Sequence, residues 1–153
     1  MSEPIVHEHF IRESFTLARQ ASRNGNHPFG ALLVKDGEIL LTAENSVNSD
    51  HDITRHAELN LVSQASRQFS PEILAQVTLY TSTEPCAMCT GAIYWAGIPV
   101  IVFGCSAESM SQITGGTPLI PCREILDRAR RPPQVIGPIL NEEGVEIHQH
   151  FWR

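Results

Sequence analysis

Two short stretches of the sequence hold residue types that bind metals and move protons. The first is "RHAELNLV" at residues 55–62, where His56 and Glu58 stand at the head of an apolar helical pattern. The second is "EPCAMC", where Cys86 and Cys89 follow a proline. Imidazole and thiolate groups are zinc ligands, and a carboxylate beside them can carry protons. Together the two stretches have the composition of a metal site with its own proton carrier.

The pair Cys86-x-x-Cys89 fits two kinds of chemistry. Residues three apart share one face of a helix, so both sulfurs can reach a single ion. The start of a helix also stabilises a thiolate over a thiol. A redox-active dithiol uses the same geometry, and this pair alone does not separate a redox site from a metal site.

His56 favours the metal site. One imidazole and two thiolates make three protein ligands, and zinc sites with three protein ligands keep a fourth position for water. A structural zinc site needs a fourth ligand, for which Cys105 and Cys122 are not obvious candidates, although this alternative stays open. The remaining histidines have no partner at metal spacing: His7, His9, His27, His51, His148 and His150.

Glu58 lies two residues after His56, and this offset places the two side chains on different faces of a helix. Glu58 is therefore not an obvious second ligand. In the first turn of a helix its carboxylate can instead lean beside a water on the metal and take up the proton of that water. Without His56 and the cysteine pair, an exposed helical glutamate would be the simpler interpretation.

The length and composition bound the class of protein. A chain of 153 residues, 42% apolar and 18% charged, suits one compact domain over residues 1–153. The formal net charge of −6 argues against a nucleic-acid partner without excluding one. The acidic N-terminal segment does not resemble a signal peptide, and no apolar run is long enough to cross a membrane. We therefore expect a cytoplasmic protein.

The hydrophobic pattern divides the chain into helices and strands. Helical spacing of apolar residues predicts helices over 8–23, 55–69, 86–97 and 122–130. Apolar and β-branched runs predict strands over 29–35, 38–45, 76–83 and 98–105, the first two joined by an Asp36-Gly37 turn. Residues 109–121 are expected to form a loop and 144–152 a last strand or tail. This order predicts an α/β fold with helices on both faces of one mixed sheet.

The combined pattern H-x-E and P-C-x-x-C is the signature of zinc-dependent nucleobase deaminases. It stands here as His56-Ala57-Glu58 and Pro85-Cys86-Ala87-Met88-Cys89. Over at least residues 10–110 the chain resembles the cytidine-deaminase-like superfamily. The resemblance implies a three-layer α/β/α sandwich with a central mixed five-stranded sheet, which agrees with the order of elements given above.

The resemblance also implies roles for individual residues. By this resemblance, His56, Cys86 and Cys89 bind one Zn²⁺ per chain, and Glu58 is the catalytic group that shuttles the proton. The residues expected to bind the substrate are Asn45, Ala57, Phe29, Trp95 and Trp152. The superfamily further suggests a homodimer.

The substrate is less clearly indicated. The stretches "HPFGALLVKDG" and "CTGAIYWA" resemble bacterial guanine deaminases, whereas "CTGAI" with "GIP" resembles small cytosine deaminases. The stretches "PCAMCTGA" and "VFG" are similar to tRNA adenosine deaminases. Guanine deaminases tend to carry "FDD" after the fourth strand, where this chain has "ITGGTPL" without an acid. We expect a free nucleobase or a related amino-heterocycle, with a guanine-type purine first, cytosine second and tRNA adenosine third.

Overall fold

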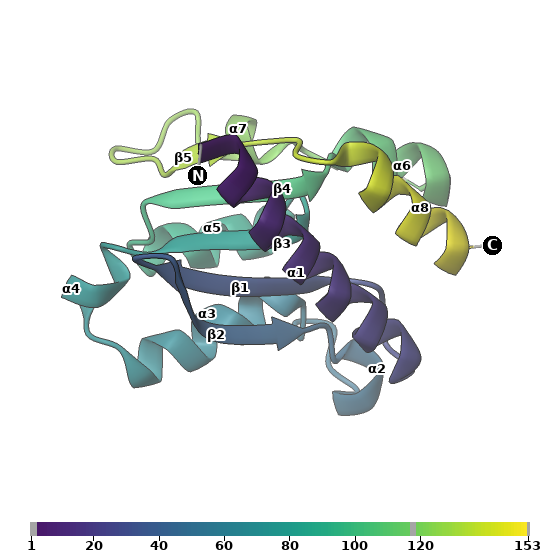
Figure 1. The fold of residues 1–153 in the computed structure, drawn as a ribbon, viewed down its shortest axis with the longest axis horizontal. Helices are drawn as coiled ribbons and strands as arrows, with labels where there is room; N and C mark the ends of the chain where they lie inside the picture. Colours follow the sequence, from purple (N-terminus) through teal and green to yellow (C-terminus); the bar gives the residue numbers. More distant parts are fainter. Residues whose placement is uncertain (1–2, 117–118, 153) are drawn as a thin grey trace.

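The computed structural model describes residues 3–116 and 119–152, and its centre is a five-stranded sheet of order β2-β1-β3-β4-β5 (Figure 1). The strands are β1 (Gly30–Lys35), β2 (Glu38–Glu44), β3 (Thr78–Thr83), β4 (Val100–Cys105) and β5 (Gln134–Ile136). The helices are α1 (Glu3–Arg23), α2 (Val47–Asp50), α3 (Ala57–Gln68), α4 (Pro71–Leu74), α5 (Ala87–Trp95), α6 (Ala107–Thr114), α7 (Cys122–Ile125) and α8 (Asn141–Phe151).

Strand direction in the sheet decides where the loops lie. Strand β1 pairs antiparallel with both β2 and β3, and β3, β4 and β5 are parallel to one another. Only β1 therefore runs against the other four strands, and β2 and β3 end at the same edge of the sheet. The turn from β1 to β2 has positive φ at Asp36 and Gly37, which confirms the predicted hairpin.

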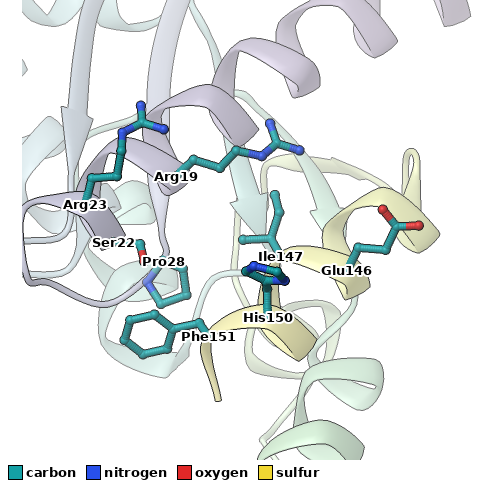
Figure 2. A pocket seen from close by; sticks show the side chains of 8 residues that line it. All are labelled: Arg19, Ser22, Arg23, Pro28, Glu146, Ile147, His150 and Phe151. Atoms are coloured by element: carbon teal, nitrogen blue, oxygen red, sulfur yellow. The ribbon is translucent and has the colours of Figure 1, made fainter. Parts of the chain in front are cut away.

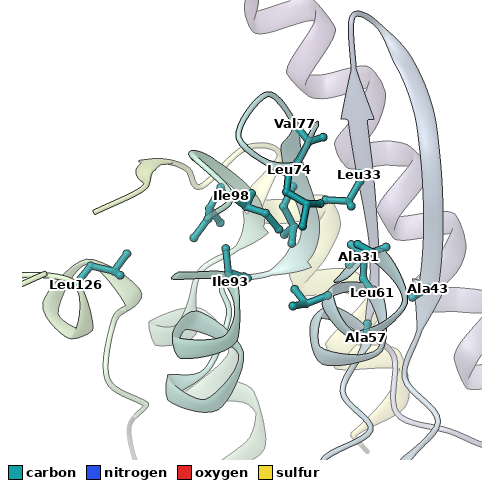
Figure 3. Packing of buried hydrophobic residues seen from close by; sticks show 14 residues of the cluster. Ala31, Leu33, Ala43, Ala57, Leu61, Leu74, Val77, Ile93, Ile98 and Leu126 are labelled. Carbon is teal, nitrogen blue, oxygen red and sulfur yellow. The ribbon is translucent and has the colours of Figure 1, made fainter. Parts of the chain in front are cut away.

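Successive side chains of a strand point to opposite faces of the sheet, and they contribute to two separate hydrophobic cores. On one face, Leu33 packs with Leu61 of α3 and Ile93 of α5 (Figure 3). On the other face, Leu32 and Tyr80 pack with apolar residues of α1 and α8. Each fully buried aliphatic or aromatic side chain contributes about 1.5–3 kcal/mol of transfer free energy. The two cores confirm the predicted sandwich of helices, mixed sheet and helices.

Helix α1 is amphipathic and covers one face of the sheet. It begins at Glu3, five residues before the predicted start, and it buries Phe10, Ile11, Phe15 and Ala18 against the strands. Apolar side chains at this spacing form one stripe along a helix. Among the described helices, α1 included, none is long and apolar enough to span a membrane.

The prediction of a strand or tail over 144–152 was wrong for residues 144–151, which belong to α8, and Trp152 follows as the C-cap residue. The helix buries Gly144, Ile147 and His148, which lie three and four positions apart on one helical face. A Cβ atom at Gly144 would lie 2.8 Å from the Cβ of Cys105. The glycine therefore does not break the helix; it lets α8 approach β4 closely.

The segment after β4 also differs from the prediction. Helix α6 occupies the first part of the predicted loop 109–121, and residues 117–118 of that loop lie outside the described residues. The predicted helix 122–130 ends at Ile125. The fifth strand is β5, which has three residues and follows two prolines. A strand this short carries too few side chains to give a period-two pattern.

Candidate metal centre

Two helix starts meet at one edge of the sheet. His56 is the N-cap residue of α3 and Cys86 is the N-cap residue of α5, and both have extended backbone angles. Helix α3 follows β2 and helix α5 follows β3, and these strands end at the same edge. The sheet topology therefore brings together residues that are thirty positions apart in the sequence.

The three predicted ligands converge on one point. The Nδ1 atom of His56 lies 3.5 Å from the Sγ atom of Cys86 and 3.6 Å from that of Cys89. All three ligand atoms lie within 4.8 Å of one another, and no fourth His, Cys, Asp or Glu of the described residues joins the group. In a tetrahedral zinc site the sulfur and nitrogen ligands are about 3.5 Å apart. The donor set therefore fits zinc with one open position.

The pKa values of the two cysteine thiols are shifted in opposite directions. Hydrogen bonding with the Cys89 thiol, and then with His56, lowers the pKa of Cys86 to about 4 against the opposing effect of burial. The same thiol–thiolate hydrogen bond, together with burial, raises the pKa of Cys89. These opposite shifts favour a thiolate at Cys86 that accepts a hydrogen bond from the thiol of Cys89. Binding of a divalent cation to both sulfurs releases that proton.

Glu58 lies in the first turn of α3 and is only 5% exposed. Burial raises the pKa of Glu58 to about 7, while the hydroxyl of Thr81 and the charge of His56 act in the opposite direction. A carboxyl group with a pKa near neutrality can both accept and donate a proton in one reaction cycle. The surroundings of Glu58 therefore suit acid–base chemistry.

Asn45 and Ala57 lie beside these groups. Asn45 is buried at the end of β2, where its Oδ1 atom accepts a hydrogen bond from the backbone N–H of Val47. Among the described residues, nothing accepts a hydrogen bond from its side-chain amide N–H groups. Ala57 is the first residue of α3, and the N–H groups of a first turn have no acceptor within the helix. Both residues can therefore donate hydrogen bonds to a ligand.

Aromatic side chains from both ends of the chain border this region. The ring of Trp152 lies 5.3 Å from the ring of His27, measured between centroids. Burial, followed by the charge of His56, lowers the pKa of His27. Phe29 packs against His148 with centroids 5.2 Å apart.

Trp95 lies apart from this group in a single chain. It is the last residue of α5 and is 85% exposed, with a ring contact to its neighbour Tyr94 at 5.7 Å. An indole with this exposure faces solvent in the isolated chain.

Sequence reasoning missed Glu84, which precedes the Pro-Cys pair. Its carboxylate is buried and accepts hydrogen bonds from the backbone N–H groups of Ala107, at 2.9 Å, and Cys122, at 2.8 Å. Its own backbone N–H donates to the carbonyl of Cys105. Glu84 therefore ties the loop that carries Cys86 to the first residues of α6 and α7. The only sequence signal was a glutamate placed between a buried strand and a proline.

Residues 4–105 match the family described as the cytidine and deoxycytidylate deaminase zinc-binding region. The chain belongs to this deaminase family. With the His-Cys-Cys group in place, the protein is a zinc-dependent enzyme of hydrolytic deamination, and the predicted zinc cofactor is confirmed at the level of the family.

Individual relatives of the deaminase differ in their substrates. It is 40% identical over 149 residues to a Schizosaccharomyces pombe protein described as a "probable cytosine deaminase", covering 94% of this chain and 90% of the relative. It is 44% identical over 91 residues to the guanine deaminase of Bacillus subtilis, covering 59% and 58%. A solved structure of the guanine deaminase from Nitrosomonas europaea, 21% identical, superposes with a TM-score of 0.80 over 94% of this chain and 83% of that chain. At this level of identity, the structural similarity shows that the two proteins share a fold.

The first prediction concerns zinc content. The purified deaminase should hold one zinc per chain, and Cys89→Ala should lose most of it because two ligands do not hold the ion tightly. Cys105→Ala is the matched control, since Cys89 and Cys105 are both fully buried thiols. Elemental analysis of the three proteins measures the effect. Equal zinc in both variants would refute the assignment of Cys89.

The second prediction concerns the two backbone hydrogen bonds that the Glu84 carboxylate accepts. In Glu84→Gln an amide NH₂ must face one of the two backbone N–H donors, so one donor is left buried without an acceptor. The free energy of unfolding should fall by about 1–3 kcal/mol. Urea denaturation measures the change, with the exposed Glu13→Gln as control. If both variants unfold at the same urea concentration, the two hydrogen bonds do not stabilise the fold.

Proposed function

We propose that the deaminase acts on a free nucleobase of the cytosine type, with guanine as the second candidate and tRNA adenosine as the third. One observation places cytosine before guanine: the likeness to the Schizosaccharomyces pombe protein covers 94% of the chain, and so most of the segment after β4. The formal net charge of −6 places tRNA adenosine last. The likeness to the Bacillus subtilis guanine deaminase covers 59%. The missing acid in "ITGGTPL" also argues against guanine, which sequence reasoning had placed first.

The reaction exchanges a ring amino group for oxygen. A C–O bond forms from water, the C–N bond breaks, and ammonia leaves with a proton that came from the water. When bound, zinc supplies the activation of that water by lowering its pKa toward about 7. In our proposal Glu58 accepts one proton of the water and gives it to the ring nitrogen. It then accepts the second proton from the hydroxyl group now on the carbon and gives it to the departing amine. Its burial and its pKa of about 7 support this role.

The proposed binding residues hold the base against the centre. The side-chain amide of Asn45 donates to a ring carbonyl oxygen, and the backbone N–H of Ala57 donates to the oxygen that develops at the reacting carbon. Phe29 and Trp152 supply aromatic surface for the flat ring. The unused donors of Asn45 and the position of Trp152 beside His27 support this arrangement.

The third prediction tests substrate and proton carrier together. Purified deaminase should release ammonia fastest from cytosine, more slowly from guanine, and slowest from an anticodon stem-loop that carries the target adenosine. A coupled assay for ammonia measures all three. Faster release from guanine would promote the second candidate, and release from the stem-loop alone would promote the third.

The matched variant in the same assay is Glu58→Gln, which keeps the shape of the side chain but cannot carry a proton. Its rate should fall by a factor of about 10² or more, with zinc content and melting temperature unchanged. A thiol–disulfide protein or a structural zinc module would tolerate this change. Full activity of Glu58→Gln would show that Glu58 is not the proton carrier.

We also propose that the deaminase is a homodimer that buries the outer face of α5. None of the nine residues of this helix is charged, and a helix that is apolar all round is normally covered. Met88, Ala92 and Trp95 lie four and three positions apart, on one face of the helix. Met88 and Trp95 are exposed in the single chain. A second copy of the chain would cover this stripe.

The fourth prediction tests this surface. Trp95→Glu places a charge in the apolar stripe and should convert the dimer to a monomer, because an unpaired charge is costly to bury. Ile5→Glu is the control, since Ile5 is an exposed apolar residue of α1 on the opposite face of the sheet. Sedimentation velocity at several concentrations gives the mass in solution. A monomeric parent protein would refute the proposal.

A further inference from the structure

His148 of α8 is 1% exposed, and both of its ring nitrogens have polar partners. The Nε2 atom lies 2.7 Å from the Oγ1 atom of Thr83, and the Nδ1 atom lies 3.0 Å from the indole nitrogen of Trp152. An indole N–H can only donate a hydrogen bond, so Nδ1 must accept it and carry no proton. The imidazole is therefore neutral, with its proton on Nε2 and directed at Thr83.

Trp152 donates two hydrogen bonds to His148. Its backbone N–H donates to the carbonyl of His148 at 2.9 Å, and its indole N–H donates to the Nδ1 atom of that residue. These two hydrogen bonds fix both the position of the backbone and the rotation of the ring. The fixed ring lies against the ring of His27, with the two centroids 5.3 Å apart.

The other side of the imidazole is anchored to the sheet. Thr83 is the last residue of β3 and stands three positions before Cys86, which is one of the zinc-binding side chains. Phe29 covers the imidazole ring from the side of β1. His148 thus connects the end of α8 to the strand that leads into the metal centre.

One side of the last turn of α8 borders an open groove. A groove of about 530 Å³ separates this turn from the end of α1, with Phe151 on one wall and Arg19 and Arg23 on the other (Figure 2). Side chains that border an open groove make fewer contacts than those in a closed core. The side-chain hydrogen bonds of His148 therefore add to the apolar packing of Ile147 in fixing this turn.

We propose that His148 is a positioning residue, which holds the Trp152 indole in one orientation at the wall of the substrate site. Its effect on substrate binding rests on the function proposed above, whereas the fixation of the indole does not. A released indole must be ordered again each time substrate binds, so the loss of His148 weakens binding more than it slows the chemical step.

The fifth prediction uses Trp152 as its own reporter. The chain has two tryptophans, so Trp95→Phe leaves Trp152 as the single indole. In this background, His148→Phe keeps an aromatic ring but removes both hydrogen bonds. Acrylamide quenching of Trp152 should become stronger and its fluorescence anisotropy should fall, with zinc content unchanged. Quenching and anisotropy equal to those of the background protein would overturn the proposal.

A second pair of variants keeps the test decisive if His148→Phe does not fold. His148→Asn places an amide oxygen near the position of Nδ1 and keeps an acceptor for the indole, whereas His148→Gln places its amide near Nε2. Anisotropy should stay high in His148→Asn and fall in His148→Gln. Equal values in the two variants would show that the hydrogen bond to the indole does not fix the ring.

Kinetics then separate positioning from a purely structural role. Against the best substrate of the panel, His148→Phe should raise KM about fivefold, the equivalent of about 1 kcal/mol for one hydrogen bond, and change kcat by less than about twofold. A fall in kcat with unchanged KM would overturn the positioning role. Because the fluorescence readout needs no substrate, a failure of the substrate proposal is seen separately.

Discussion

Three ligand atoms from two helices lie within 4.8 Å of one another, and this holds only while α3 and α5 start at the same edge of the sheet. Two sulfurs this close, one of them fully buried, do not both carry a charge without a cation between them. The fold therefore creates the metal centre, and the closeness of the two sulfurs in turn favours a bound cation. The packing of Leu61 and Ile93 behind the two helix starts keeps the geometry rigid.

A second group of buried polar residues supports this centre from behind. Glu84 fixes the loop before Cys86 through two backbone donors of α6 and α7, and His148 fixes the end of β3 through Thr83. Both act in a low-dielectric interior, where a satisfied hydrogen bond is strong and an unsatisfied one is costly. The C-terminal helices therefore belong to the architecture of the site even though they contribute no zinc ligand.

The features that depend on local residue spacing could be predicted from the sequence. His56, Glu58 and the cysteine pair were predictable because each chemical group stands within a few positions of its partners, and the apolar runs of β1, β3 and β4 mark buried strands. The two donors to Glu84 lie 23 and 38 positions away, and Thr83 lies 65 positions from His148, so no local pattern records these contacts. The close approach of Gly144 in α8 to Cys105 in β4 is likewise absent from the local spacing.

The reversed direction of β1 has a practical consequence. It sends the Asp36-Gly37 turn to the edge of the sheet opposite the metal centre, where the side chain of Asp36 is almost fully exposed. Lengthening a surface turn costs little loop entropy. This turn is therefore a suitable attachment point for an affinity label, a fluorophore or a surface linker, since an addition there touches neither the zinc-binding edge nor the outer face of α5.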